Sequence, residues 1–184
     1  MVQNNDHTTM EEVVLPEHLL PVGTVLGPGV TALDLCMVLA KIFRVQYNEV
    51  ALLRLEGGVL RFIFPEHLRT TGAIPLSSKA VAAHTALSKK PEIFNNFARV
   101  KHASIFETIK ADANGSSEPA PPAPIQKLMS VPIIDKASAV VGVIQVSRKG
   151  LDSKFAQDFS REDLHDLELV AGLLATAPAL LTTT

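Results

Sequence analysis

The chain has 184 residues, 47% of them hydrophobic, a length that fits one domain with a substantial core and is too short for two ordinary domains. Its 17 basic and 19 acidic side chains nearly balance, which disfavours nucleic-acid binding because no strong positive field is available. The single cysteine, Cys36, excludes an internal disulfide and a cysteine-based zinc cluster.

Residues 1–30 are predicted to form an N-terminal arm, partly disordered, that lies on the domain. Residues 1–12 are polar and lack the basic start and apolar run of a signal peptide. No uncharged apolar run approaches the roughly 20 residues of a membrane span, so we expect a cytoplasmic protein without a membrane partner. Pro16, Pro21 and Pro28, interspersed with glycines, predict an extended arm rather than a continuous helix.

The first predicted helix covers residues 31–43. Thr31 and Asp34 stand at the spacing of an N-cap residue and an acidic N3 residue. Apolar side chains cover more than one face of this helix, whereas a surface helix normally shows one apolar stripe. We therefore expect the helix to be sunk in the core or shared with a second subunit.

A hairpin, a third strand and a second helix are expected next. Residues 48–64 contain two strand-like runs separated by Glu56, Gly57 and Gly58, a strong short-range hairpin signal. Residues 72–76 are a possible third strand. Residues 79–89 have helical spacing, with Ser77 or Ser78 as N-cap, and Pro91 ends the helix.

Residues 93–110 are predicted to be irregular or short-helical. Their aromatic content indicates that this segment is packed and not left in solvent. Residues 111–124 hold four prolines with alanine, serine and glycine, a composition that predicts a flexible loop.

A second hairpin is predicted over residues 125–149, with Leu128, Ser130 and Pro132 on one side of its first strand and Met129 on the other. Gly142 interrupts its second strand, which predicts a close contact, from a packed helix, at that point. The last helix follows Ser160, the expected N-cap.

These elements predict an α+β fold, an antiparallel β-sheet flanked by helices. The run LMSVPIIDKASAVVGVIQVSRK, the later FSREDLHDLELVAGLLA and the earlier IPLSSKAVAAHTALSKKPEIFNN resemble the GAF domain family of small-molecule sensors. The resemblance implies one GAF/PAS-like domain over residues 31–181, containing the loop 111–124, with the N- and C-terminal helices packed together on one face.

Departures from the family's patterns bear on the ligand. Cyclic-nucleotide-binding members carry an N-K pair after the second strand of this hairpin, where this chain has Ser147, Arg148 and Lys149; they carry F-x-x-x-D-E at the last helix, where Leu164 replaces the glutamate. Members that reduce free methionine sulfoxide need several cysteines, and bilin-binding members need one in the pocket half of the domain. The cofactor is therefore unknown, with no metal, bilin or nucleotide signature.

The resemblance places the segment around the phenylalanines of residues 93–110 over the open face of the sheet, where it would help to wall a ligand cavity. The basic residues there would meet an anionic ligand, and Arg54 and Arg61 are weaker candidates. In the alternative interpretation, the phenylalanines fill a closed core and the cations are solvated. The candidate ligand-binding residues are Phe62, Phe94, Phe97, Arg99, His102 and Phe106.

The helices at the two ends of the domain carry more apolar surface than one small sheet face covers, which predicts a homodimer. The candidate interface residues are Leu35, Val38, Leu39, Leu167, Val170 and Leu174.

The resulting hypothesis is a non-catalytic, dimeric sensory or ligand-binding module that signals through a separate partner protein. One alternative is a degenerate interaction or scaffold domain without a small ligand, and a remote one is a small-molecule reductase. The histidines are dispersed and no nucleophile or phosphate-loop motif occurs, so we predict no metal site and no catalytic residues.

Overall fold

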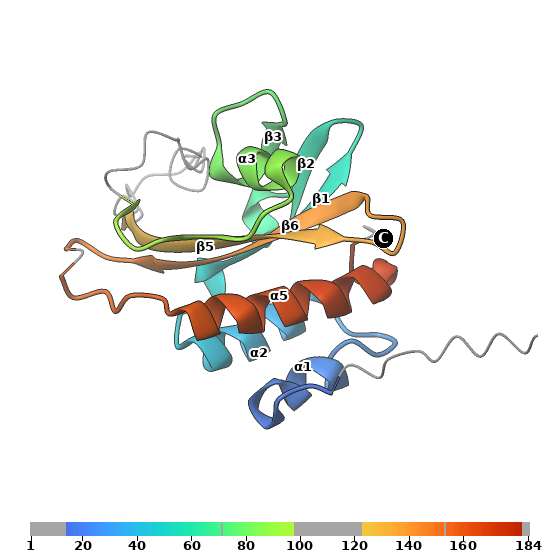
Figure 1. The fold of residues 1–184 in the computed structure, drawn as a ribbon, viewed down its shortest axis with the longest axis horizontal. Coiled ribbons are helices and arrows are strands. Elements are labelled where there is room, and N and C mark those ends of the chain that lie inside the picture. Colours follow the sequence, from blue (N-terminus) through green and yellow to red (C-terminus); the bar gives the residue numbers. More distant parts are fainter. Residues whose placement is uncertain (1–13, 71, 98–122, 153, 182–184) are drawn as a thin grey trace, which may run out of the picture.

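The computed structural model describes residues 14–70, 72–97, 123–152 and 154–181. Six strands form one antiparallel sheet in the order β3-β2-β1-β6-β5-β4 (Figure 1). The strands are β1 (Val50–Glu56), β2 (Val59–Phe64), β3 (Ala73–Pro75), β4 (Glu92–Phe94), β5 (Ile125–Ile134) and β6 (Val140–Lys149).

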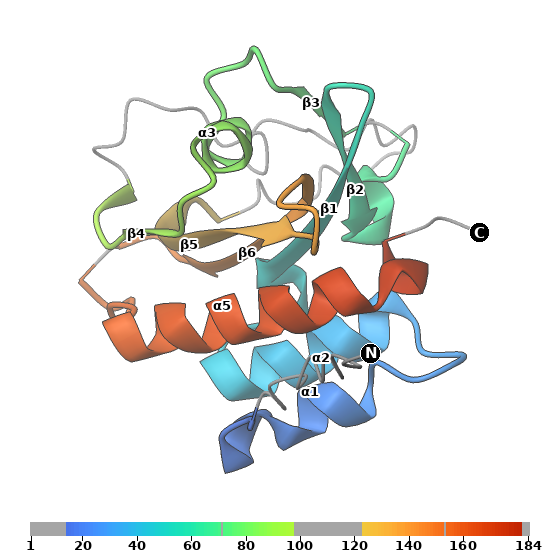
Figure 2. The same ribbon diagram turned by 45° about the vertical axis from the view of Figure 1, so that its right-hand side comes forward.

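Helices cover both faces of this sheet (Figure 2). On one face, which we call the helical face, α2 (Ala32–Phe43) and α5 (Arg161–Thr176) lie side by side. On the other, the α3 face, lies α3 (Val81–Ser88). Short 3-10 turns occur at Glu17–Leu19, Tyr47–Glu49, Glu66–Leu68 and Pro178–Leu180. The predicted α+β architecture, with the N- and C-terminal helices together on one face, is confirmed.

The β5–β6 hairpin consists of the two longest strands of the sheet, and alternate residues of β5 point to opposite faces. Ser130 pairs with Gln145, and Val131 pairs with Ile144. Met129, Val131 and Ile133 belong to the same hydrophobic cluster as the buried residues of α2 and α5, so they point to the helical face. The neighbours between them point to the α3 face, as the sequence predicts.

Predicted turn and cap residues act as expected. Gly57 and Gly58 link β1 to β2 with φ values of 58° and 78°, which favour glycine. Thr31 and Ser160 each form a capping box with the acidic residue three positions on. The hydrogen bonds that Thr31 donates to Asp34 hold the pKa of that carboxyl below its usual value.

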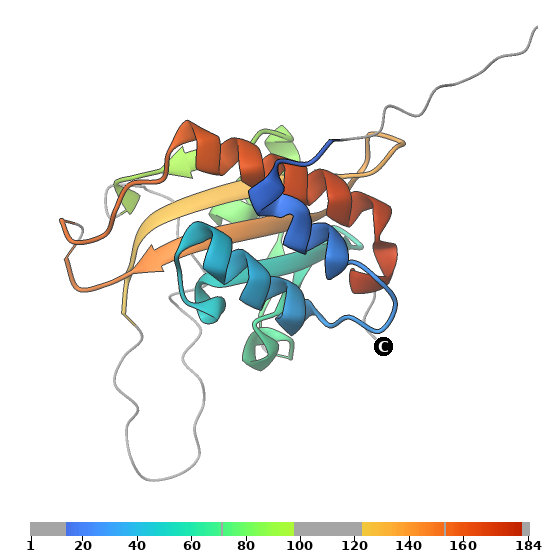
Figure 3. The same ribbon diagram turned by 90° about the horizontal axis from the view of Figure 1, so that it is seen from below.

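The N-terminal arm differs from the extended segment that its prolines predict. A 3-10 turn at Glu17–Leu19 leads into the short helix α1 (Leu20–Thr24), in which Pro21 is the second residue. Proline is tolerated in the first turn because the N–H groups there have no intrahelical acceptor, so the prediction was wrong at this point. Seen from below, α1 lies on the outer side of α2 and α5 (Figure 3).

Side chains fix α1 in this place. Leu19 and Val22 are fully buried in the cluster that α2 and α5 share. His18 Nε2 lies 2.7 Å from Oδ2 of Asp166, a buried carboxyl on α5. The arm therefore completes the hydrophobic core.

Two local predictions need correction, and a third is not tested. Helix α3 begins at Val81 after Ala80, whose side chain cannot cap, so neither predicted serine is the N-cap. Residues Glu92–Phe94 form edge strand β4, where irregular or short-helical structure was expected, because they pair with Leu128–Ser130 of β5. The prediction of a flexible loop at 111–124 falls mostly outside the described residues.

Gly142 makes the close contact that its place in a strand predicts, but with a different partner. A Cβ atom at Gly142 would lie 2.3 Å from the carbonyl oxygen of Leu53 and 3.4 Å from Ile133 Cδ1. The contact therefore comes from the backbone of neighbouring strand β1, not from a packed helix. Any larger residue requires β1 and β6 to shift relative to each other.

Candidate functional site

A chain of polar side chains crosses the α3 face. Thr85 comes from α3, Ser130 from β5 and Gln145 from β6, and all three are buried. The Ser130 and Thr85 hydroxyl oxygens lie 2.7 Å apart, and Gln145 Nε2 donates to Ser130 Oγ at 3.0 Å. We call Thr85, Ser130 and Gln145 the polar triad.

The hydrogen bonds of the polar triad run in one direction. Thr85 donates its hydroxyl proton to the carbonyl oxygen of Val81 at 2.9 Å, so it accepts from Ser130. Ser130 in turn accepts from the Gln145 amide. Each hydroxyl thus both donates and accepts, which satisfies the polar groups that burial would otherwise leave unpaired.

The surroundings of the polar triad are apolar. One hydrophobic cluster on this face contains Phe62, Leu53 and Val143, and another contains Phe97 and Leu128 with the half-buried Phe94 packed against it. A mostly apolar environment with a few fixed polar groups is the composition of a small-molecule site. The triad is neutral, so its chemistry suits hydrogen bonding to a neutral polar group.

The structure describes only some of the predicted ligand-binding residues. Phe62 and Phe97 are buried on the α3 face, and the rings of Phe94 and Phe97 meet edge to face with centroids 6.3 Å apart. The face brings Phe94 and Phe97 together, while Phe62 belongs to the other cluster. The remaining predicted residues, Arg99, His102 and Phe106, lie outside the described residues.

The weaker candidates on the first hairpin take part in ion pairs there. Arg54 and Arg61 approach the exposed Glu56 at 3.0 and 3.7 Å. None of Thr85, Ser130 and Gln145 was predicted as a site residue. Gln145 left a signal, however, since it interrupts a β-branched run that otherwise reads as a buried strand.

The dimer interface predicted on α2 and α5 requires correction. Burial within a single chain is complete for Leu35, Leu39, Leu167, Val170 and Leu174, and Val38 is half-buried against the same cluster. The sheet covers one side of α2 and α5, and α1 covers part of the other, which the sequence argument did not include. These side chains belong to the core of one chain and do not form a free surface.

Arg148 on β6 joins the sheet to the end of α2. Its guanidinium donates to the carbonyl oxygens of Phe43 and Arg44, at 3.2 and 3.3 Å, at the end of α2. It also lies 4.4 Å from the ring centroid of Phe159. Desolvation lowers the pKa of Arg148, and the nearby carboxylates of Asp163 and Glu49 oppose that shift.

Cys36, the single cysteine, is not placed for nucleophilic chemistry. Cys36 is fully buried in the core, and burial raises the pKa of its thiol, so the nucleophilic thiolate is disfavoured. Across the described ranges, no three histidine, cysteine or carboxylate side chains gather in a way that could hold a metal ion. Within those same ranges, no helix has the length and apolar character to cross a membrane.

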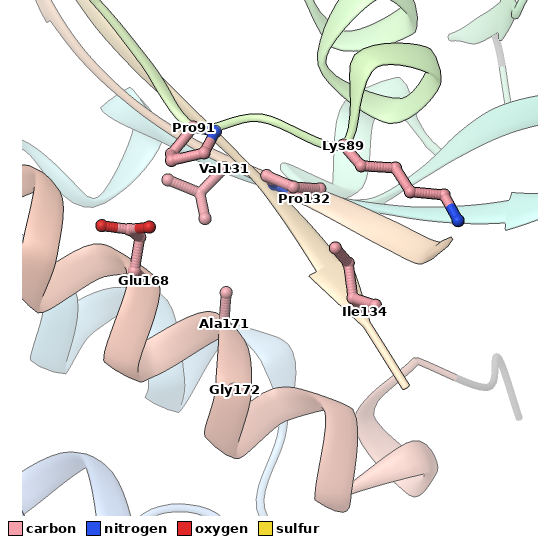
Figure 4. Close-up of a pocket in the computed structure, with 8 residues that line it drawn as sticks. All are labelled: Lys89, Pro91, Val131, Pro132, Ile134, Glu168, Ala171 and Gly172. Carbon is pink, nitrogen blue, oxygen red and sulfur yellow. The ribbon is translucent and has the colours of Figure 1, made fainter. Parts of the chain in front are cut away.

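A shallow groove of about 200 Å³ opens at the edge of the sheet, between α5 and the end of β5, and Lys89 and Pro91 from the segment that follows α3 also line it (Figure 4). Val131, Pro132 and Ala171 are its buried lining. Pro91 and Ile134 are half-buried, and Lys89, Glu168 and Gly172 form an exposed rim. We call this concavity the α5–β5 groove. Edge strand β4 pairs with β5 only as far as Ser130, so it does not cover the groove.

Comparison with known proteins gives a consistent result. The family model described as GAF domain matches residues 30–177. No curated protein matches this chain in sequence.

Solved structures agree in fold over nearly the whole chain. The GAF domain of a phosphoenolpyruvate-protein phosphotransferase from Acinetobacter has a TM-score of 0.64 at 14% identity, covering 88% of this chain and 90% of that one. The nlh2 GAF domain of A. aeolicus in an inactive state has a TM-score of 0.60 at 15% identity, with 90% and 95% covered. Residues 122 to 287 of a methyl-accepting chemotaxis protein have a TM-score of 0.57 at 13% identity, with 90% and 96% covered.

Proposed function

Because this chain belongs to the GAF domain family, we propose that it is a non-catalytic sensory module that binds a small molecule on the α3 face of its sheet. The polar triad carries this proposal. A core that only stabilised the fold would need no polar groups at this depth, because an apolar replacement of similar shape costs little or nothing. Thr85, Ser130 and Gln145 are therefore interpreted as groups that form hydrogen bonds to a ligand.

The polar triad also limits the class of ligand. Two hydroxyl groups and one amide donate and accept hydrogen bonds without carrying charge. Apolar side chains, including Phe62 and Phe97, surround them. We propose a small, neutral, partly apolar ligand with at least one hydroxyl, carbonyl or amide group.

A role in signal transduction is supported by the proteins in which similar domains occur. GAF domains similar to this one occur in a phosphoenolpyruvate-protein phosphotransferase, and a similar structure forms part of a methyl-accepting chemotaxis protein. Ligand binding on the α3 face would bias the packing of α2 and α5 through β5 and β6, which contact both faces. Dimerisation and a separate partner protein would pass this change on.

The same proposal holds that the protein is not an enzyme and that it is located in the cytoplasm. Cys36 is buried, and the raised pKa of its thiol opposes the thiol exchange that a reductase of this family uses. A lone cysteine without a disulfide partner suits the reducing cytoplasm.

An interaction domain without a small ligand is the second candidate function. Two large apolar side chains of the β6–α5 loop, Leu151 and Phe155, are 93% and 90% exposed, and exposed apolar groups of this size mark protein contacts. In this reading Phe62 and Phe97 fill a closed core and the polar triad is a structural device.

Native mass spectrometry of protein purified from its source distinguishes the two candidates. We expect a retained small molecule on the wild type and none on a variant that combines Thr85→Val, Ser130→Ala and Gln145→Met. Circular dichroism and thermal unfolding serve as the folding control for that variant. Repeated absence of a bound molecule from the wild type, or equal retention by the folded variant, contradicts the proposed site.

A further inference from the structure

The loop between β6 and α5 presents two apolar side chains to solvent. Leu151 and Phe155 are 93% and 90% exposed. Among the described phenylalanines every other ring is buried or half-buried, so Phe155 stands apart within its own chain. Singly scattered apolar residues on a surface need no explanation, but two in one short loop, each at least 90% exposed, present apolar area that a partner could bury.

Both ends of this loop are fixed to the sheet. At the first end, Gly150 donates its N–H to Pro124 O at 3.0 Å, and its carbonyl accepts from Gln126 Nε2 at 2.7 Å. At the second end, Lys127 Nζ lies 2.7 Å from Asp158 Oδ1. The fixed ends limit the freedom that the loop would lose on binding a partner.

The centre of the loop is also held in a turn. Asp152 Oδ1 accepts from the Lys154 N–H at 2.9 Å, and the Phe155 N–H donates to the Asp152 carbonyl at 3.3 Å. Phe155 is thus displayed by local hydrogen bonds, although no described side chain covers it.

The α5–β5 groove offers an apolar surface on which such a ring can pack. It is an open, shallow concavity of about 200 Å³. Its lining of Val131, Pro132 and Ala171 is apolar. The exposed rim carries one charge of each sign, Lys89 and Glu168, and the loop beside Phe155 likewise carries Asp152 and Lys154, so each charge has an opposite partner available across the contact.

We propose that the loop of one copy of this chain docks in the α5–β5 groove of a second copy, with Phe155 as the anchor. Loop and groove both border α5, one before its first turn and the other along its middle turns (Figures 1 and 4). A reciprocal exchange buries both loops and closes at two subunits, whereas a one-way contact would continue into a filament. The inference rests on the proposed dimerisation and replaces its expected surface on α2 and α5.

Two substitutions test the two halves of this contact. Phe155→Ser removes the anchor from a solvent-exposed position. Gly172→Leu fills the groove from its rim, and the fold has room for it because a Cβ atom there meets nothing within 4 Å. Leu87→Ser on α3, where the side chain is 63% exposed, is the matched control for loss of an exposed apolar group.

Sedimentation equilibrium measures the result for each variant. We expect a wild-type dimer whose Kd rises by roughly tenfold to a hundredfold in Phe155→Ser and in Gly172→Leu, the range for removing one buried aromatic side chain. The Kd of Leu87→Ser should stay unchanged. A monomeric wild type at tens of micromolar, or a dimer that either test substitution leaves intact, overturns the proposal.

Mixing the two variants identifies the pairing. Each variant homodimer lacks both contacts, while the mixed dimer keeps one, between Phe155 of the Gly172→Leu chain and the open groove of the other chain. Native mass spectrometry with one variant isotopically labelled should show the mixed dimer in excess over both homodimers, and a statistical mixture overturns the pairing. Retention of a small molecule by a monomeric protein would leave the sensory proposal standing while removing this one.

Discussion

The two faces of the sheet are built on different rules. On the helical face, Met129, Val131 and Ile133 of β5 join α1, α2 and α5 in one continuous apolar cluster. On the α3 face, the same strand alternates apolar residues with Ser130, which joins a hydrogen-bonded chain of buried polar groups. One strand thus supplies apolar packing to one side and a buried, hydrogen-bonded polar group to the other.

The two faces are therefore expected to contribute differently to the free energy of unfolding. Apolar burial stabilises in proportion to area and tolerates few vacancies, so the helical face is expected to dominate the free energy of unfolding. A buried polar chain adds little net stability when satisfied, but it costs free energy when one member is lost. Substitutions on the two faces should therefore differ in size and in kind.

The largest effect is expected on the helical face. Leu167→Ala removes a fully buried side chain of α5 and leaves a cavity, and it should lower the free energy of unfolding by about 2–5 kcal/mol. Denaturant unfolding measures this. Leu87→Ala, at an exposed position, should stay within about 0.5 kcal/mol of wild type, and equal losses for the two would contradict the contrast between core and surface.

The next effect comes from the seam between β1 and β6. Gly142→Ala places a Cβ atom 2.3 Å from the Leu53 carbonyl oxygen, so the backbone must move, at a cost of about 2–3 kcal/mol. Thermal unfolding measures the loss. Gly172→Ala is the control, since the open space there and the higher helix propensity of alanine should leave the protein unchanged or slightly more stable.

A smaller effect is expected on the α3 face, where the cost of replacing one member of the polar triad depends on whether the other two keep their polar groups. Ser130→Ala leaves the Gln145 amide and the Thr85 hydroxyl without a shared partner, and it should cost about 1–2 kcal/mol. The combination of Thr85→Val, Ser130→Ala and Gln145→Met removes all the polar groups and should unfold within about 1 kcal/mol of wild type. A triple variant less stable than Ser130→Ala alone would show that the chain is a structural requirement.

The smallest effect concerns the start of α2. The pKa of Asp34 is lowered by its hydrogen bonds with Thr31, so its contribution to stability is present above the unfolded-state pKa, about 3.9, and is lost as pH falls through the lower folded-state value. Thr31→Ala should raise the Asp34 pKa toward its ordinary value. Titration of the side-chain carboxyl by NMR measures this, and an unchanged pKa would contradict the assigned cause.

The sequence predicted most of the fold because its signals were local. Thr31 and Ser160 marked the starts of helices, Gly57 and Gly58 marked a turn, and the alternation of β5 assigned its two faces. Each of these features depends on neighbours within a few residues. The family resemblance joined them into one architecture, and the match over residues 30–177 confirms it.

The site was harder to predict because its contacts are long-range. Thr85 and Ser130 are 45 residues apart, and nothing in either local pattern indicates that their hydroxyls meet. Whether the helix with Leu35 is sunk in the core or shared with a second subunit stayed open for the same reason, since α1 packs on the helices from an earlier part of the chain. Edge strand β4, only three residues long, takes its structure from β5 rather than from its own composition.

The docking of α1 also bears on where this protein can be cut. The family match begins at residue 30, yet Leu19 and Val22 are part of the same core as α2 and α5. In addition, His18 Nε2 lies within hydrogen-bond distance of Asp166 on α5. A boundary drawn by likeness to relatives therefore falls inside the cooperative unit. Fusions and grafts of this module should begin upstream of Glu17, because a piece that starts at residue 30 brings the apolar outer side of two helices into water.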